Sequence, residues 1–202
     1  MALVPGIRFV QARYTRGPFA PGRPIGVILH RTGRANFEGL VESWRVGPTY
    51  DSGPKKGQPK RTSIHFVIGK EDGQVAQLVN TSEAAYHAGL ANEYYVGIEF
   101  VSIAAPAGTP KPQEDKVINA DSLTHHQVVA GRRILDWIST THSIPLVGPP
   151  TRQEFATANG LWNGVVSHAI VANSGLFGTD HGDEPIGLDW YILGIWPKGM
   201  MR

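Results

Sequence analysis

Four histidines occupy positions suited to chemistry, because each lies at the end of an apolar run or in a turn of small residues. The run GVILH (26–30) ends on His30, and GVVS (164–167) is followed by His168. His65 opens another apolar run, and His87 lies in the turn AAYHAG. Turns rich in small residues let the backbone approach a ligand closely. These settings indicate a site built at the edge of a sheet.

A carboxylate that follows His168 suggests a metal site. Asp180 lies in GTDHGDEP, twelve positions after His168. Two imidazoles and one carboxylate, with a fourth position left for water, are a common catalytic zinc arrangement. The chain has no cysteine, so a zinc site must use His, Asp or Glu. From spacing alone, scattered histidines that never meet are the alternative.

The remaining histidines have an ordinary structural interpretation. His125, His126 and His142 lie on or just after the longest predicted helix. A partly charged imidazole near a helix C-terminus, such as His142, is favourable without any catalytic role. We therefore expect these three residues to be structural or exposed.

Apolar periodicity predicts the elements that must position these residues. Buried strands are indicated by short apolar runs, and a helix by apolar residues spaced for one face. The pattern predicts strands over 25–29, 65–68, 74–79 and 95–102, and helices over 37–46 and 122–143. The two middle strands flank GKEDG, a hairpin signal, and Asp121 or Ser122 can cap the second helix. The expected fold class is mixed α/β, a central sheet flanked by helices.

Two segments are expected to be long surface loops. Residues 47–63 and 104–121 are rich in turn-forming residues and have little apolar periodicity. Loops of this length in a compact domain are often functional, and a plain solvated insertion is the alternative for each. The 202 residues favour one domain over 1–202.

Composition limits the classes of partner. The net charge is +2, which is too small to indicate nucleic acid but suits an anionic polymer. No window approaches 18 consecutive apolar residues, so no membrane span is expected. The N-terminal stretch lacks the pattern of a secretory signal, so we expect synthesis in the cytoplasm and, for action on a cell wall, release by a phage holin or a secretion system. A monomer is expected.

Several blocks together resemble the zinc-dependent N-acetylmuramoyl-L-alanine amidases of the type 2 family, which includes peptidoglycan recognition proteins. They occur in the family's order between about residues 25 and 190. The blocks are VILHRTG (27–33), SIHFVIGKEDGQVAQLV (63–79), AAYHAG (84–89), YVGIEFV (95–101), LTHHQVVAGRRILDWI (123–138), VSHAIVANSGLFGTDHG (166–182) and LDW (188–190).

The resemblance implies a zinc ion held by His30, His168 and Asp180. The family usually has a shorter loop before the last ligand, so Leu176 and Phe177 look like an insertion. His181 and Asp183 are therefore the alternative ligands.

The resemblance also implies a general base at Glu99, in a strand of the IGIE type. A glutamate inside an apolar strand is costly without a function or a partner, which points to Glu99 independently. The family's tyrosine variant is absent, because Ile64 occupies that position. Gly178 stands where many members have an oxyanion-stabilising Lys or Thr. The resemblance therefore implies that Thr179 or His181 replaces that residue, that an Arg or Lys comes from a loop, or that activity is weak. His87 and His65 are expected to contact substrate or the oxyanion, or to support the site.

The resemblance implies hydrolysis of the amide between N-acetylmuramic acid and L-alanine of peptidoglycan, as in phage endolysins. A peptidoglycan-binding module without catalysis is the main alternative. An unrelated zinc hydrolase of small amides and a metal-free interaction protein are further alternatives.

Overall fold

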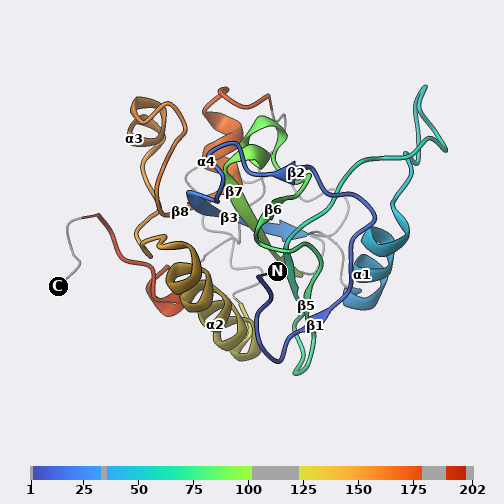
Figure 1. Ribbon diagram of the computed structural model, residues 1–202, viewed down its shortest axis with the longest axis horizontal. Helices are drawn as coiled ribbons and strands as arrows, with labels where there is room; N and C mark the ends of the chain where they lie inside the picture. The colour runs from blue at the N-terminus through green and yellow to red at the C-terminus, as the bar shows by residue number, and fades with distance from the viewer. Residues whose placement is uncertain (1, 33–35, 102–122, 179–189, 199–202) are drawn as a thin grey trace, which may run out of the picture.

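The computed structural model describes residues 2–32, 36–101, 123–178 and 190–198 (Figure 1). A six-stranded sheet lies at the centre of the molecule, in the order β1-β5-β4-β7-β3-β8. Its strands are β1 (Arg8–Phe9), β3 (Gly26–Thr32), β4 (Phe66–Ile68), β5 (Val75–Gln77), β7 (Tyr95–Val101) and β8 (Val165–Ser167). A separate two-stranded sheet pairs β2 (Gly17–Pro18) with β6 (Glu83–Ala84).

The sheet is mixed, and its parallel part includes the strands that carry the histidines. β4, β7, β3 and β8 are parallel neighbours. β5 is antiparallel to β4, as the GKEDG turn predicts, and parallel to β1. All seven residues of β7 are buried, which is typical of a strand covered on both faces. The mixed α/β class is therefore confirmed.

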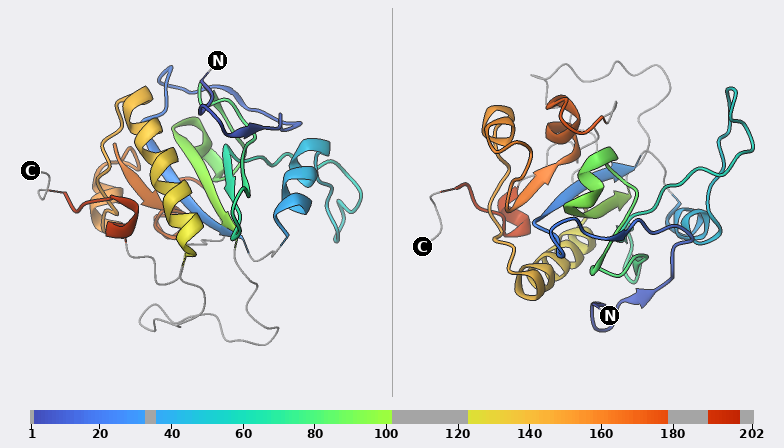
Figure 2. Two further views of the ribbon diagram at one scale, coloured as in Figure 1. Left: turned by 90° about the horizontal axis from the view of Figure 1, so that it is seen from below. Right: turned by 45° about the horizontal axis from the view of Figure 1, so that its top comes forward.

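The longest helix, α2 (His125–His142), covers one face of the sheet (Figure 2). Ile134, Leu135 and Ile138 of α2 pack in a cluster with Leu29 and Ile98 of the sheet. Side chains alternate between the two faces of a strand, so Ile28 and His30 point to the other face. That face is covered by α1 (Phe37–Val46), α3 (Arg152–Thr157), α4 (His168–Asn173) and the 3-10 helix η1 (Gly89–Glu93).

Side-chain caps define where the helices start. Asn36 caps α1, whose bounds match the predicted 37–46. Thr124 caps α2 and forms a capping box with Gln127. The sequence interpretation that Asp121 or Ser122 caps this helix is therefore wrong, because Thr124 has the required acceptor three positions before Gln127.

The sequence pattern does not predict several of the strands and helices. They include β1, β2, β6, η1, α3, α4 and the 3-10 helix η2 (Trp190–Leu193). Residues 47–63 form no helix or strand, as predicted, whereas the predicted loop 104–121 lies outside the described residues. Among the helices of the described ranges, none combines the length and apolar character needed to span a membrane.

Candidate metal and catalytic site

Three neighbouring strands bring His30, Glu99 and His168 to one edge of the sheet. In the parallel register, His30 of β3 is the partner of Glu99 of β7. On the other side of β3, Leu29 is the partner of Ser167 of β8, and His168 follows directly. Carboxyl ends of parallel strands are the usual place for ligand sites in α/β sheets. The sheet therefore assembles residues that are far apart in the sequence.

The imidazoles of His30 and His168 lie side by side. Their ring centroids are 4.4 Å apart, with an angle of 47° between the ring planes. The two residues are 2% and 1% exposed. The neutral form of an imidazole is the one that binds metal ions. Two buried imidazoles at this separation are suited to share a cation.

His87 holds the ring of His30. His87 Nε2 lies 3.1 Å from the carbonyl oxygen of Tyr95, and only a protonated nitrogen can donate to that acceptor. His87 Nδ1 is then an acceptor, and His30 Nε2 donates to it at 2.8 Å. This hydrogen bond leaves Nδ1 as the lone-pair nitrogen of His30. Burial, followed by the neighbouring His30, lowers the pKa of His87 well below its ordinary value.

His65 packs against His87 in the same histidine cluster. The backbone N–H of Gly97 donates to His65 Nδ1 at 3.0 Å, and His65 Nε2 donates to the carbonyl oxygen of Glu83 at 2.8 Å. Its ring packs edge-on against His87, with centroids 5.8 Å apart. Burial lowers the pKa of His65 to about 4, so the ring is neutral at physiological pH. Because backbone groups use both nitrogens, the supporting role is favoured over contact with substrate.

Asn92 fixes the turn that carries His87. Its side-chain oxygen accepts hydrogen bonds from the backbone N–H groups of His87 at 2.7 Å and Ala88 at 2.6 Å. Asn92 is 4% exposed, so these bonds lie out of contact with solvent. Sequence reasoning missed this residue. The stretch LANEY that follows AAYHAG has no pattern that marks Asn92 as buried.

Gly97 makes room for His87, because a Cβ atom at position 97 would lie 2.8 Å from His87 Nδ1 and 2.4 Å from Ile64 Cδ1. We expect Gly97→Ala to displace His87 and to lower the free energy of unfolding by about 1–3 kcal/mol. Loss of the partner that orients a metal-binding imidazole weakens metal binding by roughly 10- to 100-fold. Chemical denaturation and zinc titration measure the two effects.

The matched control for Gly97→Ala is Gly39→Ala on the exposed side of α1. That substitution is expected to leave metal affinity unchanged. Equal metal affinity in the two variants would contradict the role of Gly97 in seating His87.

Some predicted site residues fall outside the described ranges. These are Asp180, Thr179, His181 and the alternative ligand Asp183. Among the described residues, no group of three or more His, Asp or Glu side chains is arranged to hold a metal ion. The third ligand therefore stays a prediction.

The segment that leads to Asp180 is anchored in the core. Phe177 is 7% exposed and packs with Phe155 and Tyr94, at centroid distances of 6.2 and 6.3 Å. Its carbonyl oxygen accepts a hydrogen bond from the backbone N–H of Leu90 at 3.0 Å. Phe177, which the resemblance marks as part of an insertion, is thus a core residue. Gly178 follows with φ of +66°, a conformation that favours glycine over lysine or threonine.

The other histidines do not join the cluster. All three belong to α2, which covers the opposite face of the sheet. His126 Nδ1 lies 3.2 Å from a carboxylate oxygen of Asp72, and His142 Nε2 lies 2.9 Å from Thr81 Oγ1. The remaining one, His125, is exposed. Their placement agrees with the expected structural or exposed roles.

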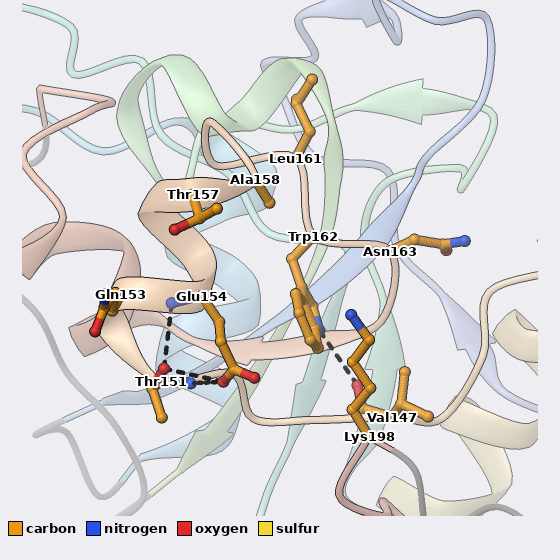
Figure 3. A pocket seen from close by; sticks show the side chains of 10 residues that line it. All are labelled: Val147, Thr151, Gln153, Glu154, Thr157, Ala158, Leu161, Trp162, Asn163 and Lys198. Atoms are coloured by element: carbon orange, nitrogen blue, oxygen red, sulfur yellow. Dashed lines mark hydrogen bonds between the residues drawn. The ribbon is translucent and has the colours of Figure 1, made fainter.

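A pocket of about 620 Å³ has no histidine among the residues that line it, and Figure 3 shows these residues. Trp162 lines it and precedes β8, whereas His168 follows β8. The Lys198 ammonium lies 5.4 Å from the centroid of the Trp162 ring. Glu154 also lines this pocket, but its carboxylate is held by Thr151 as part of the α3 cap. The pocket is therefore distinct from the histidine cluster.

Comparisons with known proteins agree with this arrangement. The N-acetylmuramoyl-L-alanine amidase family (Amidase_2) matches residues 20–182. The chain therefore belongs to the Amidase_2 family. It is 34% identical over 89 residues to N-acetylmuramoyl-L-alanine amidase A of Achromobacter lyticus, and the match covers 44% of each chain. The matched part is thus less than half the length of that relative.

Solved structures share the fold. The hydrolase AmiA of Staphylococcus aureus, in complex with its ligand, superposes with a TM-score of 0.58 and 15% identity, covering 90% of this chain and 74% of AmiA. A selenomethionine derivative of AmpD superposes with a TM-score of 0.54 and 15% identity, covering 95% and 94% of the two chains. At this level of identity, the similarity establishes the fold.

Proposed function

We propose that this protein hydrolyses the amide bond between N-acetylmuramic acid and the L-alanine of the peptidoglycan stem peptide, with the aid of a zinc ion. The main support for the proposal is that His30, His168 and Glu99 lie at one edge of the sheet. The chain that holds them belongs to the Amidase_2 family. Membership of that family makes this amide the expected substrate.

The described donor set fits zinc. Zinc in proteins is bound by neutral imidazoles and carboxylates. His30 and His168 are buried neighbours, and the hydrogen bond to His87 fixes which nitrogen of His30 carries the lone pair. Metal-binding histidines commonly have such a partner at the second ring nitrogen. His30 and His168 would therefore hold the ion together with Asp180, whose role stays a prediction.

The proposed reaction needs a base as well as a metal. When bound, zinc supplies Lewis acidity, which polarises the amide carbonyl and makes water a stronger nucleophile at neutral pH. Glu99 removes a proton from the attacking water as the bond from oxygen to the carbonyl carbon forms. Glu99 then delivers that proton to the nitrogen of L-alanine as the carbon–nitrogen bond breaks. The products are a carboxylate on the muramic acid and a stem peptide with a free amine.

The histidines behind the metal ligands have positioning roles in this proposal. His87 uses one nitrogen on the Tyr95 carbonyl and the other on His30, so it orients His30. His65 packs against His87 and stays neutral. An oxyanion in the tetrahedral intermediate also needs a hydrogen-bond donor. Thr179 and His181 stay the predicted donors.

The test is the release of stem peptides from purified peptidoglycan. We expect mass spectrometry to detect free stem peptides that begin at L-alanine. Chelation should abolish their release, and added zinc should restore it. Binding to peptidoglycan without release of amines would contradict the enzyme and support a binding module. Cleavage of simple amides with indifference to the muramyl sugar would contradict the substrate.

A further inference from the structure

The segment 47–63, which we name the basic arm, concentrates positive charge. It contains Lys55, Lys56, Lys60 and Arg61 against one acidic residue, Asp51. Every residue from 51 to 61 is exposed. In Figure 1 the basic arm reaches away from the sheet on the side of α1, opposite α3. It therefore presents a local charge of +3 on a projecting surface.

The cations of the basic arm have no acidic partner in the described part of the chain. None of its three lysines, nor Arg61, forms an ion pair with a described residue. Three arginines on the body of the molecule are paired with carboxylates instead, as Arg8–Glu38, Arg16–Glu93 and Arg45–Glu42. Uncompensated charge on one projecting segment attracts anionic partners.

The basic arm is ordered by its own hydrogen bonds. The Tyr50 N–H donates to the Gln58 carbonyl at 3.0 Å, and the Gly57 N–H donates to the Tyr50 carbonyl at 2.8 Å. The Lys55 and Lys60 ammonium groups lie 5.7 and 5.9 Å from the centroid of the Tyr50 ring. Cations held in place around one ring lose less entropy when a partner binds.

The root of the basic arm adjoins the histidine cluster. The Ser63 N–H donates to the Tyr86 carbonyl at 3.0 Å, and the Tyr86 N–H donates to Ser63 Oγ at 3.0 Å. His87 follows Tyr86, and His65 lies two positions after Ser63. The basic arm therefore starts beside the turn that carries His87.

We propose that the basic arm binds the free carboxylates of stem peptides that neighbour the cleaved one on the same peptidoglycan polymer. This inference rests on the proposed function. Peptidoglycan repeats carboxylates along its length, and lysine ammonium groups serve flexible carboxylates as compact point charges. A net charge of +2 for the whole chain is small for a nucleic-acid-binding protein, which favours the carboxylate polymer.

The experiment compares two triple variants of the full chain in co-sedimentation with purified peptidoglycan sacculi. The arm variant combines Lys55→Gln, Lys56→Gln and Lys60→Gln. At low salt we expect it to bind sacculi about tenfold more weakly and with a smaller dependence on salt concentration. The matched variant removes the same charge on the other side of the molecule, with Arg132→Gln, Arg152→Gln and Lys198→Gln, and is expected to bind as the unsubstituted protein does.

Three results would overturn the proposal. They are equal weakening in both triple variants, undiminished binding to sacculi whose carboxylates have been amidated, and full displacement from sacculi by short duplex DNA at equal charge. Stem-peptide release by the unsubstituted protein tests the proposed function separately. If the arm variant binds sacculi more weakly but the unsubstituted protein releases no stem peptides, the role of the basic arm is supported and the amidase activity is contradicted. If stem peptides are released but the arm variant binds as well as the unsubstituted protein, the amidase activity is supported and the role of the basic arm is contradicted.

Discussion

Replacing His168 with Ala is expected to remove zinc binding, and replacing His30 with Ala is expected to do the same. The two imidazoles are buried neighbours, so each variant leaves a single described imidazole among the proposed metal ligands. Loss of a partner that only orients a ligand already weakens metal binding by roughly 10- to 100-fold. Loss of a ligand itself should weaken zinc binding by more than that range and should abolish amidase activity.

Metal analysis after dialysis measures this effect. We expect about one zinc ion per chain in the unsubstituted protein and close to none in either variant. His125→Ala is the matched control, because His125 is an exposed histidine on α2. Circular dichroism separates loss of metal from loss of the fold. A folded His168→Ala variant with normal zinc content would exclude His168 as a ligand, and the same holds for His30.

The strand ends of the site could be predicted from sequence because burial leaves a local pattern. The apolar run before His30 and the one before His168 both end abruptly on an imidazole, and β3 and β8 end at or near these positions. Their order in the sheet could not be predicted in the same way. β3 lies between β7 and β8, although 138 positions separate His30 from His168. Only pairing between distant strands fixes that contact, and no local pattern records it.

The interactions that hold the ligands in place were also beyond sequence reasoning. The sequence alone allows His87 to be an oxyanion or substrate contact, or a hydrogen-bonded histidine. Choosing between these needed the distance to His30 and to the Tyr95 carbonyl. Gly97 is conspicuous within β7, but its function depends on the imidazole that packs against it from another segment. Such contacts depend on the tertiary structure and leave no periodicity.

The N-terminal part of the sheet illustrates a different limit. β1 has two residues and pairs with β5, and β2 pairs with β6 in a separate sheet. Strands of this length carry too few residues for an alternating pattern to stand out. Their backbone groups are nevertheless paired, and Gln77 ties the N-terminal segment to the sheet by accepting from the Val4 N–H at 2.9 Å.

Glu99→Gln is expected to retain zinc and to lose turnover by roughly 10²- to 10⁴-fold, the usual contribution of a general base. Glutamine has nearly the same shape as glutamate but cannot accept the proton from water. Glu99 is 8% exposed and pairs in register with His30, so it lies beside the proposed metal ligand on the same face of the sheet. A buried glutamate in a fully buried strand is costly unless it has a partner or a function.

The control for Glu99→Gln is Glu38→Gln, which removes a carboxylate from an exposed ion pair with Arg8 and should leave turnover unchanged. Turnover across a range of pH distinguishes a base from a purely structural glutamate. If Glu99 is the base, the unsubstituted protein loses activity at low pH as this carboxylate is protonated, and the residual activity of Glu99→Gln lacks that limb. Near-normal turnover with zinc retained would exclude Glu99, and the base would then have to come from another residue at the same sheet edge.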